Sequence, residues 1–177
     1  GTGFLLSNAG KQRTWGVELE SSANPVDPLT LNFAVTWLDP TYISFPISSV
    51  GNLTGTVPAG IAEWTVVLGA QWEQELGNGD ALIARSGFHF ESESTISEGL
   101  AGFLPLGQAA AIAAANQFSR QVDDLSASLA YGFTDLDLEL ALWGRNLLND
   151  RYLQQIFDSP AQRGSIAQPN PLRNEFL

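Results

Sequence analysis

The chain has 177 residues, 44% of them hydrophobic, which is enough for one folded domain or for part of a larger one. Its net charge of −11 comes from 8 Lys and Arg against 19 Asp and Glu, and it disfavours binding to the phosphate backbone of nucleic acid. The sequence contains no cysteine, which excludes thiolate metal sites, cysteine nucleophiles and disulfides.

Neither a membrane-spanning helix nor a secretory signal is visible. No uninterrupted apolar run reaches the roughly 20 residues that a membrane helix needs, but a transmembrane β-barrel would leave no such run either. Residues 1–7 lack the charged start and the apolar core of a secretory signal. An exported protein needs that signal, so a membrane-barrel interpretation requires a signal upstream of Gly1.

Alternation of apolar and polar residues predicts six β-strands, because successive side chains of a strand point to opposite faces. In chain order these strands lie at about residues 14–20, 29–37, 64–73, 82–91, 124–133 and 136–145. The last strand has the clearest pattern, with alternate leucines from Leu136 to Leu142 on one face and with Asp137 and Glu139 on the other. The predicted apolar face includes Leu31, Phe33, Val35, Leu68, Leu129, Leu138 and Leu140, and the polar face includes Glu18, Asn32, Gln71, Arg85, Asp124 and Glu139.

Short and long connections alternate between the predicted strands. The short ones have the composition of tight turns and lie at residues 24–28, 77–80 and 134–135. The long ones lie at about residues 39–62, 92–120 and 149–171, and the alanine-rich stretch 109–115 predicts a short helix in the second. Transmembrane barrels show this asymmetry, with short periplasmic turns and long outer loops.

Alternation alone would favour a soluble β-sandwich, but three further features favour a membrane barrel. The strands span about 10 to 13 residues, against roughly 5 to 6 in globular proteins, and tilted membrane strands need about 9 to 11. Aromatic residues cluster near strand ends on the apolar face, and charged residues and glycines occupy the opposite face. The sequence therefore predicts an all-β fold, an antiparallel transmembrane β-barrel segment of about 6–8 long strands.

Three segments resemble motifs of the TonB-dependent outer-membrane receptors. Residues 16–20 resemble a recurring G-x-E-x-E strand, and residues 37–42 resemble a Y-L-D-A-x-Y strand end, with Trp37 and Pro40 as departures. Residues 144–152 resemble the G-x-N-L-x-[ND]-x-x-Y signature near the C-terminus of these receptors. The residues that match the first and third motifs are Gly16, Glu18, Glu20, Gly144, Asn146, Leu147, Asn149 and Tyr152.

The resemblance implies that the complete barrel has 22 strands and lies in the outer membrane of a Gram-negative bacterium. Residues 1–177 would be its C-terminal portion, roughly the last third, and therefore a partial barrel. It also implies TonB-coupled uptake of a scarce ligand such as a ferric siderophore, cobalamin, haem or a carbohydrate. The expected partners are the lipid bilayer, a plug domain, TonB, the barrel-assembly machinery and this small molecule. The sequence has no plug domain and no TonB box, and it stops within the expected final strand, so we expect unpaired outer strands.

The alternative, a small self-contained β-barrel or β-sandwich for binding or adhesion, remains open, because the six strands together with partial strands at residues 3–6 and 172–177 could barely reach eight, the smallest common barrel. We find no motif for an enzyme, a cofactor or a metal site; His89, the single histidine, is interpreted as a polar residue of the lumen. Glu18 and Glu20 could contact a cationic or hydroxylated ligand, or they could join arginines or the plug inside the barrel. The candidate ligand contacts are Tyr42 and Phe45 in the first long loop, Phe103 in the second, and Arg85, His89 and Glu91 on the fourth strand.

Overall fold

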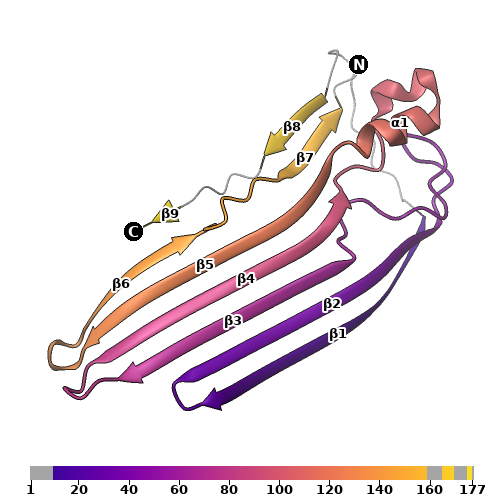
Figure 1. The fold of residues 1–177 in the computed structure, drawn as a ribbon. Coiled ribbons are helices and arrows are strands. Elements are labelled where there is room, and N and C mark those ends of the chain that lie inside the picture. Colours follow the sequence, from indigo (N-terminus) through magenta and orange to yellow (C-terminus); the bar gives the residue numbers. More distant parts are fainter. Residues whose placement is uncertain (1–9, 159–164, 170–174, 177) are drawn as a thin grey trace.

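The computed structural model describes residues 10–158, 165–169 and 175–176. Seven strands form one antiparallel sheet in the order β1-β2-β3-β4-β5-β6-β9, and β7 pairs with β8 in a separate hairpin (Figure 1). The strands are β1 (Lys11–Val26), β2 (Leu29–Ser44), β3 (Trp64–Glu75), β4 (Ala81–Thr95), β5 (Ser119–Phe133), β6 (Leu138–Arg145), β7 (Leu153–Asp158), β8 (Ser165–Pro169) and β9 (Glu175–Phe176). The helical elements are η1 (Ala101–Leu106), α1 (Gln108–Ala115) and η2 (Thr134–Leu136).

The strand register keeps apolar and polar residues on opposite faces of the sheet. Phe33 lies opposite Leu68, which lies opposite Phe88, so one apolar row crosses three strands. The adjacent row, on the other face, contains Asn32 and Gly69. Directly paired residues share a face, and the same relation holds across all six main strands. The predicted division between the two faces is therefore confirmed.

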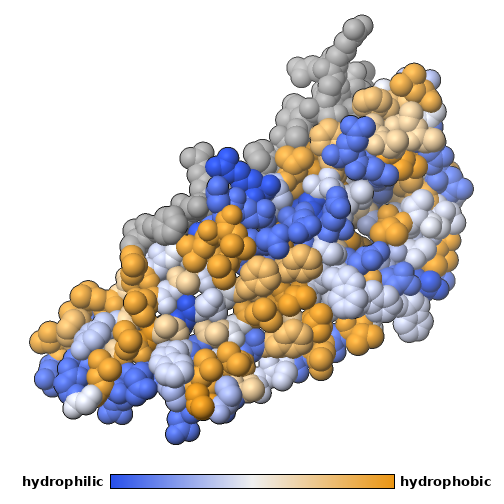
Figure 2. Space-filling view, viewed as in Figure 1, coloured by the Kyte–Doolittle hydropathy of each residue, from blue (hydrophilic) through white to orange (hydrophobic). Residues whose placement is uncertain are grey.

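The apolar face has no covering layer among the described residues. Leu140 is 59% exposed and Leu142 is 64% exposed, although both belong to regular strand structure. Hydrophobic side chains spread over the strands in Figure 2. A β-sandwich would bury these side chains against a second sheet, so the described strands do not form one. A small closed barrel would pair β1 with a last strand, whereas within the described ranges β1 pairs with β2 alone.

The buried core lies where the long loops meet, at one end of the sheet. One cluster joins Tyr42, Val50 and Leu53 to Ala111 of α1. A second joins Leu100 and Ala115 to Ile156 of β7. The helix predicted at residues 109–115 is confirmed as α1, and in the part of the chain that the structure describes no helix is long and apolar enough to cross a membrane.

Several predicted boundaries are wrong because pairing between strands extends them. The first turn is only residues 27–28, because β1 and β2 pair from Gln12 opposite Tyr42 to Val26 opposite Leu29. Tyr42 therefore lies in β2 and not in the first loop.

The last predicted strand and the third long loop also differ from the structure. β6 begins at Leu138 and has 8 residues, because residues 134–136 form a helical turn and Asp137 adopts a left-handed conformation with φ of 48°. The stretch predicted as a third long loop contains the β7–β8 hairpin. The outer edge of β6 is not fully unpaired, because two residues of β9 pair with Gly144 and Arg145.

Two terminal predictions fall largely outside the described residues. The partial strand expected at residues 3–6 lies entirely outside them, and of the strand expected at residues 172–177 only Glu175–Phe176 is described, as β9.

Candidate functional site

At the loop end of the sheet, the loops 45–63 and 96–118 are joined to each other. The Tyr42 hydroxyl donates a hydrogen bond to Glu98 over 2.8 Å, and the Gln108 side chain donates one to the carbonyl of Asn52 over 2.7 Å. The backbone N–H of Gly60 donates to the carbonyl of Thr95 over 2.7 Å. The bond between Gln108 and Asn52 joins the two loops directly, and the other two bonds join each loop to the strand end beside the other loop, so the loops form one packed body.

Tyr42 is part of this packing. Its side chain is 8% exposed and its ring meets Phe45 edge-on, with 4.9 Å between ring centroids. Burial, the hydrogen bond to Glu98 and the charge of that carboxylate raise the pKa of Tyr42 to about 12. Direct contact between Tyr42 and a ligand would therefore require this cluster to open. Phe103 on η1 is 42% exposed and faces no such restriction.

A cavity of about 220 Å³ lies between the two loops. Its lining combines apolar side chains with hydroxyl, amide and carboxylate groups. The lining residues are Leu53, Thr56, Val57, Thr95, Ser97, Glu98, Ile112 and Asn116. A lining of this kind can hold a small molecule through both apolar contact and directed hydrogen bonds.

Below the loops, the polar face carries a connected group of ionisable side chains. Glu91 of β4 accepts a short hydrogen bond from Arg120 of β5, and its other oxygen lies 3.5 Å from Nε2 of His89. The Arg120 guanidinium lies over the Tyr152 ring, 5.8 Å from its centroid. The structure thus brings the candidates His89 and Glu91 together, and it adds Arg120 and Tyr152.

Arg85, another candidate, does not join this group. It lies four residues before His89 on β4, about 13 Å along the strand at roughly 3.3 Å per residue. Its Nε donates a hydrogen bond to the Gln71 side chain over 3.2 Å. Within the described ranges, no group of three or more His, Asp or Glu residues could hold a metal ion.

Arg120 was missed by the sequence analysis because no alternation marks the start of β5. Residues 119–121 are Ser, Arg and Gln, so the predicted strand began at Asp124 and left Arg120 in a loop. The register of β4 with β5 places Arg120 opposite Ser94, next to Glu91. The signal available in the sequence was that Arg120 lies two residues before Val122 and four before Asp124, so the three residues would share a face of an extended strand.

The segment 144–152 ends β6 and returns the chain towards β5. Asn146 is buried and left-handed, with φ of 47°. Its side chain donates to the carbonyl of Asp150 over 3.0 Å and accepts from the Asp150 N–H over 2.8 Å. The Asp150 carboxylate accepts the N–H of Asp123 over 2.8 Å, and Leu147 donates to the carbonyl of Leu125. Asn is favoured here because it tolerates a left-handed backbone conformation and its side chain can hydrogen-bond to nearby backbone groups.

The other motif segment, on β1, depends on close strand approach. A Cβ at Gly16 would lie 2.6 Å from the Trp37 carbonyl oxygen and 2.6 Å from Leu38. Glu18 and Glu20 follow on the polar face, and both are exposed on the outer strand of the described sheet. Gly16 is therefore needed for strand packing, and the two glutamates remain available to another segment or a ligand.

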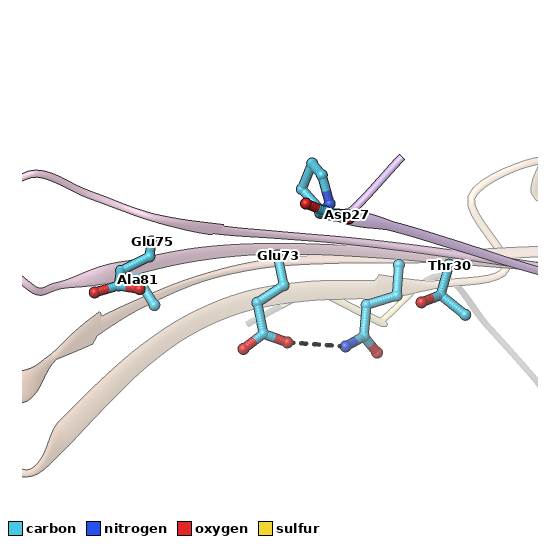
Figure 3. A pocket seen from close by; sticks show the side chains of 7 residues that line it. Asp27, Thr30, Glu73, Glu75 and Ala81 are labelled. Atoms are coloured by element: carbon cyan, nitrogen blue, oxygen red, sulfur yellow. Dashed lines mark hydrogen bonds between the residues drawn. The ribbon is translucent and has the colours of Figure 1, made fainter. Parts of the chain in front are cut away.

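A second recess, of about 400 Å³, lies at the opposite, turn end of the sheet (Figure 3). Figure 3 shows that Thr30 and Glu73 point to the same side of the strands. The Gln71 side chain donates a hydrogen bond to Glu73 over 3.2 Å. Asp27 and Glu75 also line the recess, so it is acidic and open to solvent.

Comparison with known proteins identifies a family and finds solved structures that resemble this chain. The family model described as "TonB dependent receptor-like, beta-barrel" matches residues 1–156. The crystal structure of BauA, the ferric preacinetobactin receptor from Acinetobacter baumannii, is similar with a TM-score of 0.56 and 19% sequence identity. The match covers 94% of this chain and 20% of that receptor, so this chain spans about a fifth of its relative. No curated protein sequence matches the chain.

Proposed function

Because the chain belongs to the TonB-dependent receptor β-barrel family, we propose that residues 1–177 form the C-terminal portion of the barrel of an outer-membrane receptor in a Gram-negative bacterium. The observation that carries this proposal is the family match over residues 1–156. The family consists of transport receptors and not of enzymes. The uncovered apolar face supports the proposal, because a bilayer would cover it.

The spacing of aromatic residues supports a bilayer as the partner of this face. Trp37 and Trp64 are paired at one end, with 6.4 Å between ring centroids. Leu29 and Trp72 form a pair eight residues further along the same strands. At about 3.3 Å per residue these pairs are roughly 26 Å apart along the strands, or about 20 Å along the membrane normal for strands tilted by about 40°, which is slightly less than the apolar band of about 25 Å in transmembrane barrels. Tyr42 and the long loops would then lie beyond the band, on the outer side.

The proposed activity is TonB-coupled uptake of a scarce ligand. A ferric siderophore is our first choice because the structural relative is a ferric preacinetobactin receptor, and cobalamin, haem and carbohydrates are the alternatives. The plug domain and the segment that contacts TonB would belong to other parts of the receptor. The barrel-assembly machinery would insert the whole barrel into the membrane.

The proposed ligand contacts lie at the loop end. His89 and Glu91 offer hydrogen-bonding groups on the polar face near the loop end, and Phe103 offers an exposed ring on η1. Tyr42 and Phe45 would act by holding the two loops in position, since their rings pack within the loop body. Arg85 would lie deeper, on the same polar face.

Uptake by cells tests the proposal. The gene that contains this chain is deleted, and uptake of radiolabelled iron with hydroxamate and catecholate siderophores, of haem, of cobalamin and of oligosaccharides is measured with and without TonB. We expect the uptake of one ligand to require both the gene and TonB. Unchanged uptake of every ligand after deletion would contradict the proposal.

The contact residues need a separate comparison in the full receptor. His89→Ala and Glu91→Gln should each reduce binding of the transported ligand by about tenfold, the usual loss for a directed polar contact. Glu139→Gln, on the same face at the turn end, should leave binding unchanged. Equal binding by all three variants would exclude the polar face near the loop end as the contact surface.

A further inference from the structure

A hollow on the polar face, away from the loop end, lies between two arginines. Its volume is about 250 Å³, and it crosses β4, β5 and β6. Arg85 stands on one side, and Trp143 with Arg145 stands on the other. Arg145 and Trp143 were not among the residues singled out from the sequence, and they belong to neither the loop cavity nor the His89–Glu91 group.

The hollow exists because its floor is made of small side chains. Ser128 pairs with Arg85 on one side and with Trp143 on the other, so these three residues form one row across the sheet. In the next row Gly87 pairs with Ser126. A Cβ at Gly87 would lie 3.3 Å from the Ser126 hydroxyl oxygen, so a larger side chain there would begin to fill the floor.

The two walls are positively charged. Arg85 uses Nε to donate to Gln71, and four further N–H donors belong to its terminal nitrogens. The Arg145 guanidinium lies over the Trp143 ring, 5.0 Å from its centroid, and this contact orients it. Two strand spacings, roughly 10 Å in total, separate the backbones that carry the two walls.

Neither guanidinium has an acidic partner among the side chains that the structure describes. The ion pairs found there join Glu91 to His89 and to Arg120. This is notable in a chain with 19 Asp and Glu, because carboxylates are abundant on the same face. Glu175 of β9 is paired opposite Arg145 at the edge of the sheet, but the lining of the hollow itself contains no Asp or Glu. Two arginines beside an open hollow without a carboxylate in its lining argue for a bound anion.

We propose that this hollow binds a carboxylate group, held between Arg85 and Arg145 above the serine floor. A guanidinium presents parallel N–H donors that match the two oxygens of a carboxylate, and the Ser128 hydroxyl can donate to a remaining lone pair, whereas the Ser126 hydroxyl donates to the Gly87 carbonyl. The carboxylate can come from another segment of the receptor or from a small polycarboxylate in solution. The site does not require that the receptor transports a ligand.

The test uses the purified full receptor in detergent, with citrate as the probe and with ionic strength held constant. Variants Arg85→Gln and Arg145→Gln are compared with the wild type and with Arg13→Gln, a matched charge change on exposed β1. Citrate binding is measured by calorimetry, and the thermal midpoint is measured with and without citrate. Arg85→Lys is included because it keeps the charge but loses the fork geometry.

Two results support the site and identify the source of the carboxylate. If the source is solution, the wild type and Arg13→Gln bind citrate, and both hollow variants bind it about tenfold more weakly. If the source is another segment, citrate does not bind. The thermal midpoint without citrate is then lower in Arg85→Gln and Arg145→Gln than in the wild type, and Arg85→Lys lies between Arg85→Gln and the wild type. These differences from the wild type become smaller at high salt.

The proposal is overturned if neither measurement separates the hollow variants from Arg13→Gln. It is also overturned if the thermal midpoint falls equally in Arg85→Gln and Arg85→Lys at every salt concentration, because the loss would then come from packing and not from charge.

Discussion

The carboxylate of Asp80 accepts a hydrogen bond from the Tyr131 hydroxyl over 2.8 Å, although the two residues are 51 positions apart. The same carboxylate accepts the N–H of Thr134 over 3.0 Å and the side-chain amide of Asn78 over 2.6 Å. Thr134 in turn donates its hydroxyl proton to the carbonyl of Gly79. One carboxylate therefore ties the β3–β4 turn to the β5–β6 turn.

Asp80→Asn should loosen both turns. The Tyr131 hydrogen bond, followed by the Thr134 bond, lowers the pKa of Asp80, so its stabilising contribution is present above the unfolded pKa and is lost as pH falls through the folded value. Amide exchange at Thr134 should be about fivefold faster than in the wild type at neutral pH. The difference should shrink in acid, where the wild type also loses the ionised form. Asp27→Asn, in the first turn, is the control, and equal exchange in the two variants would contradict this prediction.

Gly16→Ala should destabilise the barrel by about 1–3 kcal/mol, because a Cβ 2.6 Å from the Trp37 carbonyl forces the β1 and β2 backbones apart. Gly69→Ala is a matched control on β3, where the nearest atom, in Asn32, is 3.5 Å away. Urea unfolding of the receptor in lipid vesicles measures both variants. Equal midpoints would mean that β1 is not held against β2 as described.

Asn146→Ala should cost about 2–4 kcal/mol, since it removes two hydrogen bonds to Asp150 and places alanine in a left-handed conformation. Asn146→Gly restores the backbone freedom alone and should recover about 1 kcal/mol. Asn149→Gly, at φ of 54° on an exposed residue, should be neutral. The measurement is the same urea unfolding, and a harmless Asn146→Ala would show that the motif does not stabilise this strand end.

Leu68→Arg and Val67→Arg place the same charge on adjacent residues that face opposite sides of β3. On the apolar face the charge should cost about 2–4 kcal/mol near the middle of a bilayer, whereas on the polar face it should be tolerated. The folded fraction in the outer membrane, seen as the heat-modifiable band in electrophoresis, measures the difference. The reverse order would mean that the leucine face points into the barrel.

Tyr42→Phe should loosen the contact between the loops 45–63 and 96–118 while keeping the ring in place. Loss of the hydrogen bond to Glu98 should increase protease cleavage within residues 45–63 by about fivefold. Because the folded pKa of Tyr42 is raised to about 12, this bond is present below pH 10 and is lost as pH rises towards that value. The control Ile47→Ala, at an exposed loop position, should leave the cleavage rate unchanged. An unchanged rate in Tyr42→Phe would mean that the hydrogen bond to Glu98 does not order the loop.

The two faces of the strands could be predicted from the sequence because each residue carries its own local signal. Leu138 and Glu139 point to opposite faces of their strand whatever residues lie beside them in the sheet. The pairing of the strands then keeps the apolar side chains on one face and the polar side chains on the other. The ends of the strands could not be predicted, because pairing decides them. Tyr42 is in a strand because Gln12 lies opposite it, and the polar start of β5 has no alternation to mark it.

The candidate site was predicted only in part for the same reason. His89 and Glu91 are two residues apart on one strand, so their common face was visible from spacing alone. The partners Arg120 and Glu98 come from distant segments, and no periodic pattern connects Tyr42 with a residue 56 positions later. The hollow between Arg85 and Arg145 depends on Gly87 having no side chain. The position of Gly87 between the two arginines becomes visible only once the register of the strands is known.

The shared core of the two outer loops constrains how their sequences can change. Val50 and Leu53 of one loop pack against Ala111 of the other, so a larger side chain at Ala111 would collide with both. A change in the shape of either loop therefore requires a compensating change in the other. On the proposed function, a new ligand specificity at this end would be acquired by coordinated substitutions in both loops, and grafting a single loop from a relative should fail.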